Sequence, residues 1–259
     1  LAALLLTPLA WARVGPELRA LPRRDLLLAL ASGAFLAVHF ASWISSLAYT
    51  SVASSVALVS TNPLWVGLAS LLIFRERLGW RTLAGIAATL AGTILIGLAD
   101  LTSTQPDPAL GNALALVGAA TVSAYLLIGR DLRRRVSVLA YIYVVYSAAA
   151  AVLLAWALLA GAPLGGYPPG VYLLLVGRAV GPQLLGHTSF NYALSTLSAT
   201  FVAVAILGEP VGSAILAFLV FDERFAPLQL AGFLLLMLGI VVASTDAAPR
   251  RPAAQPVVE

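Results

Sequence analysis

A glutamate and a proline stand side by side inside a long apolar run near the C-terminus. Glu209 and Pro210 lie within the stretch from Leu197 to Phe221. An isolated carboxylate in hydrocarbon costs about 2.5 to 3.5 kcal/mol on insertion scales, so it normally faces a protein interior or a water-filled cavity. Proline removes a backbone N–H and loosens the helix beside it. An ionisable group at a helix break is typical of a transport pathway, whereas a neutral or Arg-paired Glu that fixes helix packing is the alternative interpretation.

Polar side chains also recur at helical spacing in the run from Val171 to Leu194. Gln183, His187 and Asn191 are four residues apart, so they share one face of a helix. Such a stripe predicts that this face lines a cavity. Simple hydrogen bonding to a neighbouring helix is the alternative.

The run from Leu26 to Ala48 carries a matching stripe of His39, Trp43 and Ser46. Histidine titrates near neutral pH, so His39 together with His187 could relay protons. A histidine that only makes a structural hydrogen bond explains each residue equally well.

Arg178 and Tyr125 are the remaining polar candidates inside apolar runs. Arg178 is expected to snorkel towards the membrane surface, to pair with Glu209, or to bind a substrate carboxylate. Tyr125 and Tyr146 are expected to line the cavity, with an aromatic belt at the cytoplasmic membrane surface as the alternative. For Tyr141 and Tyr143, which lie near a helix end, an aromatic belt at the membrane surface is the favoured interpretation.

Composition shows that these residues belong to a polytopic membrane protein. Of the 259 residues, 61% are hydrophobic and 10% are charged, and the mean hydropathy is +0.96, far outside the soluble range. The absence of cysteine excludes a disulfide framework and a thiolate metal site. No cofactor or metal is expected, and the basic pI does not indicate nucleic acid because the Arg residues lie in short loops between apolar runs.

Runs long enough to cross about 30 Å of hydrocarbon cover most of the chain. Leu1 to Trp11 is too short to span before Arg13 and is interpreted as the end of a truncated helix. The eight expected spans are Leu26–Ala48, Val52–Phe74, Thr82–Leu98, Leu110–Gly129, Val138–Ala160, Val171–Leu194, Leu197–Phe221 and Leu228–Ala243. Alternate crossings place thirteen of the Arg residues on one side and only Arg224 on the other, so that side is predicted to be cytoplasmic, with the C-terminus on it.

The sequence also repeats itself after 147 residues without a gap over about 46 positions. The shift superimposes Asn62-Pro63 on Glu209-Pro210 and places His39 next to His187. Further matches are Leu47 with Leu194, Ser51 with Ser198, Phe74 with Phe221, Glu76-Arg77 with Glu223-Arg224, Leu83-Ala84-Gly85 with Leu230-Ala231-Gly232, and Gly92 with Gly239. The charged copies fall on opposite sides, so the repeats are inverted and each needs an odd number of helices.

These residues resemble the EamA domain of the drug/metabolite transporter superfamily, which occurs twice here, over Ser46–Gly92 and Ser189–Gly239. The resemblance implies an all-α fold of two inverted five-helix repeats, a bacterial inner-membrane location and the export or exchange of small metabolites such as amino acids. The expected parts are 1–99 (first repeat, without its first helix and part of its second), 100–109 (external linker loop), 110–245 (second repeat) and 246–259 (disordered cytoplasmic tail).

The function expected from the sequence is secondary transport by alternating access. No G-x-x-x-x-G-K-[ST] motif is present to bind a nucleotide, so a gradient must supply the energy. Proton coupling through Glu209 and uncoupled facilitated export both remain open. An intramembrane enzyme using His39, His187 and Glu209 is the rival class, but H-E-x-x-H and G-x-S-x-G are absent and no catalytic residue is assigned. The expected partners are a small-molecule substrate and the bilayer, with a monomer plausible.

Overall fold

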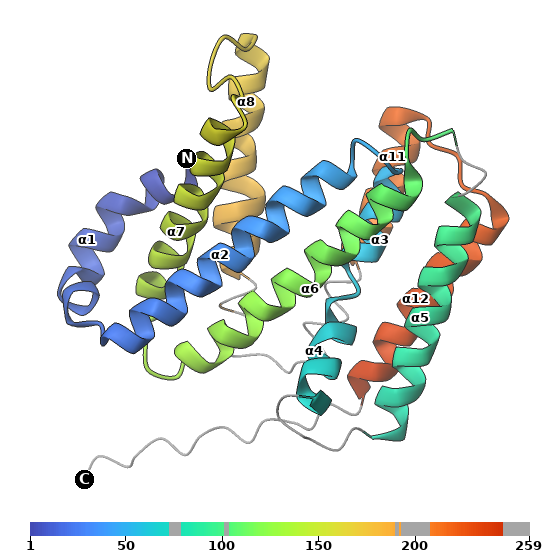
Figure 1. Cartoon of the computed structure of the whole chain (residues 1–259), viewed down its shortest axis with the longest axis horizontal. Coiled ribbons are helices and arrows are strands. Elements are labelled where there is room, and N and C mark those ends of the chain that lie inside the picture. Colours follow the sequence, from blue (N-terminus) through green and yellow to red (C-terminus); the bar gives the residue numbers. More distant parts are fainter. Residues whose placement is uncertain (73–78, 101–103, 190–191, 193–207, 246–259) are drawn as a thin grey trace.

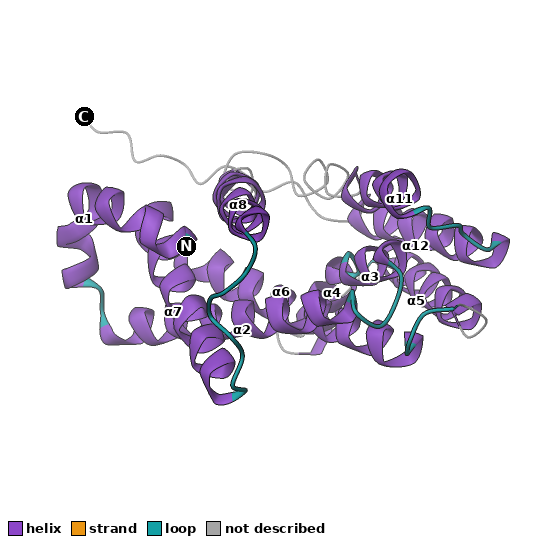
Figure 2. Ribbon diagram, turned by 90° about the horizontal axis from the view of Figure 1, so that it is seen from above, coloured by secondary structure: helices purple, strands orange, loops and turns teal. Residues whose placement is uncertain are grey.

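The computed structural model of the chain is a bundle of helices and describes residues 1–72, 79–100, 104–189, 192 and 208–245 (Figure 1). All of its regular structure in these ranges is helical, as expected (Figure 2). The helices are α1 (Ala2–Ala20), α2 (Arg23–Ser46), α3 (Val52–Val59), α4 (Asn62–Leu72), α5 (Trp80–Asp100), α6 (Pro108–Leu132), α7 (Val138–Leu159), α8 (Pro169–Arg178), the π-helix η1 (Ala179–His187), α11 (Gly208–Phe221) and α12 (Pro227–Thr245).

Five stretches are long and apolar enough to cross a membrane, in agreement with the polytopic fold. They are Arg23–Ser46, Val52–Ala69, Trp80–Asp100, Pro108–Leu132 and Val138–Leu159, and α11 and α12 are shorter apolar helices. The expected tail, 246–259, lies outside the described residues.

Two helices extend further than the sequence indicated. The first helix does not stop at Arg13: α1 continues to Ala20, although it contains Pro8 and Pro16. Asp100 does not belong to a linker loop but is the last residue of α5. In both cases packing against neighbouring helices decides where the helix ends, and neither proline nor a charged residue ends a helix by itself.

The expected span from Val52 is interrupted between α3 and α4. The hydroxyl groups of Ser60 and Thr61 donate to the carbonyls of Val56 and Leu58 at 2.8 and 2.7 Å, which closes the end of α3 locally. Pro63 is the second residue of α4, a position in the first turn where the missing N–H costs no helical hydrogen bond. The second interruption is the change from α8 to the wider π-helical turns of η1, which contain Pro182.

Helices α5 and α12 are equivalent in the two repeats, and their backbones touch. A Cβ atom on Gly85 would lie 2.5 Å from the carbonyl oxygen of Gly239, and one on Gly92 would lie 2.7 Å from that of Gly232. The reverse contacts, from Gly239 to Gly85 and from Gly232 to Gly92, are 2.7 and 2.9 Å. Because the earlier glycine of each helix meets the later one of the other, the two helices run antiparallel, as inverted repeats require.

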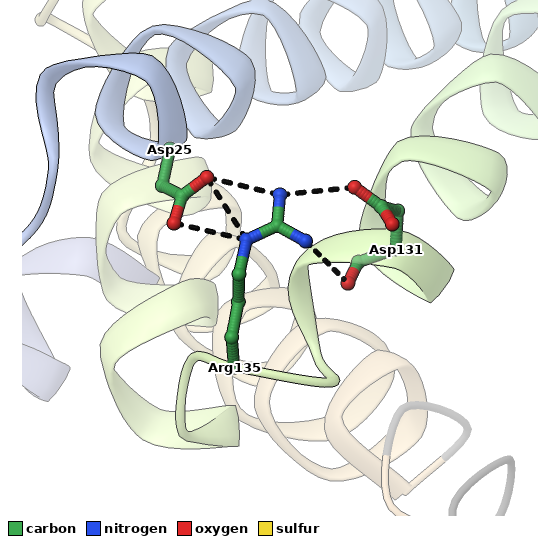
Figure 3. Close-up of polar contacts among 3 residues, drawn as sticks. All are labelled: Asp25, Asp131 and Arg135. Carbon is green, nitrogen blue, oxygen red and sulfur yellow. Dashed lines mark hydrogen bonds and ion pairs between the residues drawn. The ribbon is translucent and has the colours of Figure 1, made fainter.

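The end of the bundle where α2 begins and α6 ends, here called the Arg-rich end, is held by ionic contacts. Arg135 donates from Nε to both carboxylate oxygens of Asp25, at 3.0 and 2.9 Å, and from Nη2 to Asp131 at 2.9 Å (Figure 3). Glu17 of α1 accepts hydrogen bonds from the backbone N–H and the hydroxyl of Ser137 at the start of α7. These contacts join α1, α2, α6 and α7.

The glycine contact predicts a position-specific effect of a single methyl group on α5. We expect Gly85→Ala to lower the free energy of unfolding by about 1 to 3 kcal/mol, because the added Cβ would collide with the backbone of α12. The matched control is Gly97→Ala on the same helix, where a Cβ meets nothing within 4 Å and the higher helix propensity of alanine should leave stability equal or raised. Thermal unfolding of the purified full chain in detergent measures both, and equal melting temperatures would contradict the close contact.

The ionic contact predicts that Arg135→Gln destabilises the Arg-rich end. The substitution leaves the buried carboxylate of Asp25 without its cation. The neighbouring Arg134→Gln removes the same charge from an exposed side chain and serves as the control. A lower melting temperature for Arg135→Gln alone is expected, with the difference reduced at high salt; identical curves would show that the contact adds nothing.

Candidate functional site

The two histidines singled out in the sequence meet where α2 crosses η1. The ring centroids of His39 and His187 are 6.5 Å apart, and Phe40 lies 5.5 Å from His187. Trp43 stacks on His39 at 5.5 Å. Since a shift of 147 residues relates Phe40 to His187, equivalent helices of the two repeats cross at this point. We call His39, Phe40, Trp43 and His187 the aromatic cluster.

Helix α6 fixes the position of this cluster. The Nδ1 atom of His39 lies 2.9 Å from the carbonyl oxygen of Gly118, a hydrogen bond if Nδ1 carries the proton. Gly118 also lets α2 approach, because a Cβ there would lie 3.2 Å from the Cβ of Trp43. The ring of His39 is therefore held from two sides.

Several polar atoms on α2, on α4, on α7 and just after η1 are buried without a hydrogen-bond partner in the part of the chain that the structure describes. They are Nε1 of Trp43, Oδ1 of Asn62, Oη of Tyr146 and Oγ1 of Thr188. The Tyr146 hydroxyl lies beside Thr188 and Gln183 but has hydrogen-bond geometry to neither. A buried polar atom without a partner costs about 1 to 3 kcal/mol, so these atoms are suited to a polar ligand or water.

Asn62 and Tyr125 are placed by α6. The carbonyl of Asn62 accepts a hydrogen bond from Ser123 at 3.0 Å, which ties the first residue of α4 to α6. Tyr125 is fully buried, and its ring stacks on Tyr141 at 6.4 Å. Its carbonyl accepts a hydrogen bond from Ser32 at 3.3 Å. Tyr125 therefore contributes to the packing of α2 and α7 against α6.

The aromatic-belt interpretation of Tyr141 is wrong. Its side chain is 1% exposed, and its hydroxyl lies 2.7 Å from that of Ser32. The sequence places Tyr141 one turn from the start of a span, but α2 and α6 cover that end of α7. Tyr143, two residues on and half-buried, accepts a hydrogen bond from Trp11 of α1.

The other candidates lie apart from the cluster. Glu209 is in the first turn of α11 with an exposed side chain, and Pro210 beside it is buried. Arg178 ends α8 and is exposed. Neither Glu209 nor Arg178 makes an ion pair with a described residue, so the Glu209–Arg178 pair, one of the alternatives for Arg178, is absent there. Asn191 lies outside the described residues.

A buried polar group that the sequence did not reveal lies at the other end of α5. Asp100 is 2% exposed and accepts hydrogen bonds from Ser54, Asn112 and Gln229. In the sequence, each of these donors looks like an ordinary polar residue near a helix start. Only the meeting of α3, α6 and α12 distinguishes them from capping residues.

A hollow on α7 is lined by none of these groups. It has a volume of about 560 Å³ and is lined by Val152, Ala155, Trp156, Leu159 and Ala160 on the exposed side of α7. An apolar hollow on an exposed apolar helix face suits lipid chains better than a polar ligand.

The fold and the repeat define a polytopic membrane protein made of two inverted repeats. A sequence model of the EamA-like transporter family matches residues 1–98 and 109–245. The chain therefore belongs to the EamA-like transporter family, as the resemblance in its sequence indicated, and it is a multi-pass membrane protein of the transporter class.

Structure comparison agrees with this fold. One solved structure, described only as "Crystal structure of protein", is 20% identical, with a TM-score of 0.54 and coverage of 95% of each chain. At this identity the likeness concerns the fold alone. The comparison with curated proteins gave no match.

The corrected position of Tyr141 predicts a stability effect of its hydroxyl. We expect Tyr141→Phe to cost about 1 kcal/mol, because it removes a buried hydrogen bond to Ser32. Tyr49→Phe is the control, since the Tyr49 hydroxyl makes no hydrogen bond among the described residues. Chemical or thermal unfolding in detergent measures the difference. Equal stability of Tyr141→Phe and the parent would contradict a buried hydrogen bond at Tyr141 and favour its place at the membrane surface.

Proposed function

We propose that this protein is a secondary transporter that exports or exchanges a small metabolite, an amino acid or a similar compound, by alternating access. The observation that carries the proposal is the aromatic cluster at the crossing of α2 and η1, with unpaired buried polar atoms around it. Transport sites of inverted-repeat proteins lie at the interface of the repeats, near helices that depart from regular α-helix, as η1 does.

The symmetry of the contacts supports the alternating-access part of the proposal. Equivalent helices cross twice, α2 with η1 at the cluster and α5 with α12 at the glycines. Exchanging the conformations of the two repeats would preserve both crossings while opening the opposite side of the membrane. Two states of similar free energy then follow from one sequence, and a substrate gradient can shift their populations.

The chemistry around the cluster favours a substrate with a planar or apolar part and neutral polar groups. The rings of His39, Phe40, Trp43 and His187 supply flat surfaces, while Trp43 Nε1 can donate and Asn62 Oδ1 can accept a hydrogen bond. Gln183 and Tyr146 add further polar atoms on the side of η1 and α7. Tyr125 of α6 is proposed as a further residue of the pathway, and so is Asn191, which lies outside the described residues.

The ionisable residues have proposed roles outside the cluster. Glu209 follows Gly208 at the start of α11 and is exposed, so it can exchange a proton or attract a substrate amine. Arg178 can attract a substrate carboxylate. With His39 and His187 able to relay protons, proton-coupled export is the proposed form, and uncoupled facilitated export is its variant.

The proposed setting is a bacterial inner membrane, with the Arg-rich end and the C-terminus in the cytoplasm. Thirteen Arg residues on one side against one on the other support this orientation. It places Asp100 and the start of α6 at the external end. No part of the proposal requires an oligomer.

Export by this site predicts that Trp43 is needed and a lipid-facing tryptophan is not. We expect cells expressing the parent chain, but not those with an empty vector, to accumulate a metabolite in the medium. Trp43→Leu should lower its rate of appearance at least about tenfold, the cost of losing one well-made contact of roughly 1.4 kcal/mol. Trp156→Leu, on a side chain that is 57% exposed on α7, should export normally at equal expression.

Comparative metabolomics of the culture medium makes the measurement, with membrane levels of each variant checked by immunoblot. A Trp43→Leu protein that exports like the parent would remove the aromatic cluster from the pathway. Glu209→Gln, tested at two external pH values in the same cells, tests coupling through this carboxylate, because only export coupled through Glu209 should lose its pH dependence in the variant.

A further inference from the structure

A buried carboxylate joins four helices at the end of the bundle opposite the Arg-rich end. Asp100 is the last residue of α5 and is 2% exposed. The Nδ2 atom of Asn112 donates to one carboxylate oxygen at 2.8 Å. The hydroxyl of Ser54 and the Nε2 atom of Gln229 donate to the other, at 3.2 and 3.1 Å. The carboxylate and its three donors come from α5, α3, α6 and α12, and the labels of α3, α5 and α12 lie together in the right half of Figure 1.

Nothing within the described residues balances the charge of this carboxylate. No Arg or His nitrogen lies within 4 Å of Asp100 among them. Three neutral donors stabilise an ionised carboxylate in part, and the first turns of α3, α6 and α12 add partial positive charge. A full charge buried in a membrane protein is nevertheless normally neutralised by a proton, a metal ion or a side chain.

Two buried oxygen atoms next to the carboxylate have no donor. Asn112 Oδ1 belongs to the same amide that binds Asp100 and is unpaired. Oγ1 of Thr50 lies beside the carboxylate without reaching hydrogen-bond geometry and is also buried. With Ser54 Oγ, these atoms could accept a hydrogen bond from a protonated Asp100 or complete an oxygen shell around a small cation.

No other ionisable group in the described residues of this end makes an ion pair with Asp100. Helices α3 and α12 contain none, and the segments that adjoin these helices carry Tyr49, Asp107, Glu223 and the exposed pair Asp222 and Arg224. Asp107 is exposed and caps α6 through the N–H of Leu110 at 3.1 Å. Glu223 accepts a hydrogen bond from the N–H of Val52 at 3.0 Å.

The group is complete only when the two repeats meet. Asp100, Ser54 and Thr50 come from the first repeat, and Asn112 and Gln229 from the second. Opening this end would separate the donors from Asp100 and expose the carboxylate to water, where ionisation is favoured. Closing it buries the carboxylate again, so closure and neutralisation are linked.

We propose that Asp100 is a binding site for a monovalent cation, H⁺ or Na⁺, taken up from the external side, and that its neutralisation allows the external end to close. This inference rests on the proposed alternating access and names the residue that couples it to an ion. Proton and sodium share the required chemistry, a single positive charge on a carboxylate surrounded by neutral oxygen atoms.

Closure can be followed without a transported substrate, because the chain has no cysteine. Ala53→Cys places one thiol at a position that is 2% exposed in the first turn of α3, next to Ser54. The purified full chain in nanodiscs is treated with a hydrophilic maleimide, and the rate of thiol labelling is measured. This rate is divided by the labelling rate of Thr104→Cys, a variant with its thiol in an exposed loop. This ratio removes the pH dependence of the thiol reaction itself.

Two arms distinguish the cations. In choline buffer without Na⁺, lowering the pH from 8 to 5 should reduce the normalised rate at least about tenfold if the proton is the ligand. At pH 8, adding Na⁺ in place of choline should give a similar reduction if sodium is the ligand. A lower normalised labelling rate in either arm supports the site. An unchanged rate in both arms overturns the proposal.

Asp100→Asn assigns the response to this carboxylate. The neutral amide should keep the normalised rate low and independent of pH and Na⁺, whereas Asp107→Asn, a carboxylate at the same end that retains helix-capping ability, should respond like the parent. A response that persists in Asp100→Asn overturns the proposal. If Asp100→Asn does not fold, the parent's two arms are compared with those of a double variant that carries Asp107→Asn and Glu223→Gln. Loss of the cation response in the double variant would place the cation at those residues and overturn the proposal.

The outcome does not depend on the identity of any metabolite. Export without a cation response would remove the coupling site and leave the transport proposal standing. A cation response without export would support the cation site and contradict the transport proposal.

Discussion

Direct contact between the backbones of α5 and α12 is the constraint on which the arrangement of the repeats depends. In lipid there is little hydrophobic drive for one apolar helix to pack on another, so association relies on close van der Waals contact through small residues. Gly85, Gly92, Gly232 and Gly239 leave no room for a Cβ atom at the crossing. Gly85 meets Gly239, and Gly92 meets Gly232. Because each contact joins the earlier glycine of one helix to the later glycine of the other, the two repeats are held as antiparallel copies around a common axis.

Polar groups of opposite character lie at the two ends of the bundle. The end of α5 brings Asp100 to the first turn of α12, where Gln229 donates to it. At the Arg-rich end, Arg135 neutralises Asp25 directly, and burial of that carboxylate needs no further ion. A bundle with one ionically closed end and one end that requires a cation is suited to opening on the second side first.

The internal repeat made part of the candidate site predictable from the sequence. His39 and His187 were expected at corresponding depths because a shift of 147 residues nearly superimposes them, and the structure places their rings 6.5 Å apart. Glu209 was the most conspicuous residue of the sequence, yet its side chain is exposed. Hydropathy identifies a costly residue in an apolar run, but it does not tell which face of the helix the neighbouring helices cover.

What the sequence by itself determined was the membrane class, the helical fold, the repeat and the family, because each depends on local composition or on matching patterns along the chain. Apolar length is sufficient to require a helix in lipid. Only the tertiary structure decided that α1 continues past Arg13, that Tyr141 is buried against Ser32, and that Asp100 is the meeting point of four helices. These features depend on contacts between residues far apart in the chain, such as Asp100 with Gln229, and a side chain's neighbours across such a distance leave no pattern in its own segment.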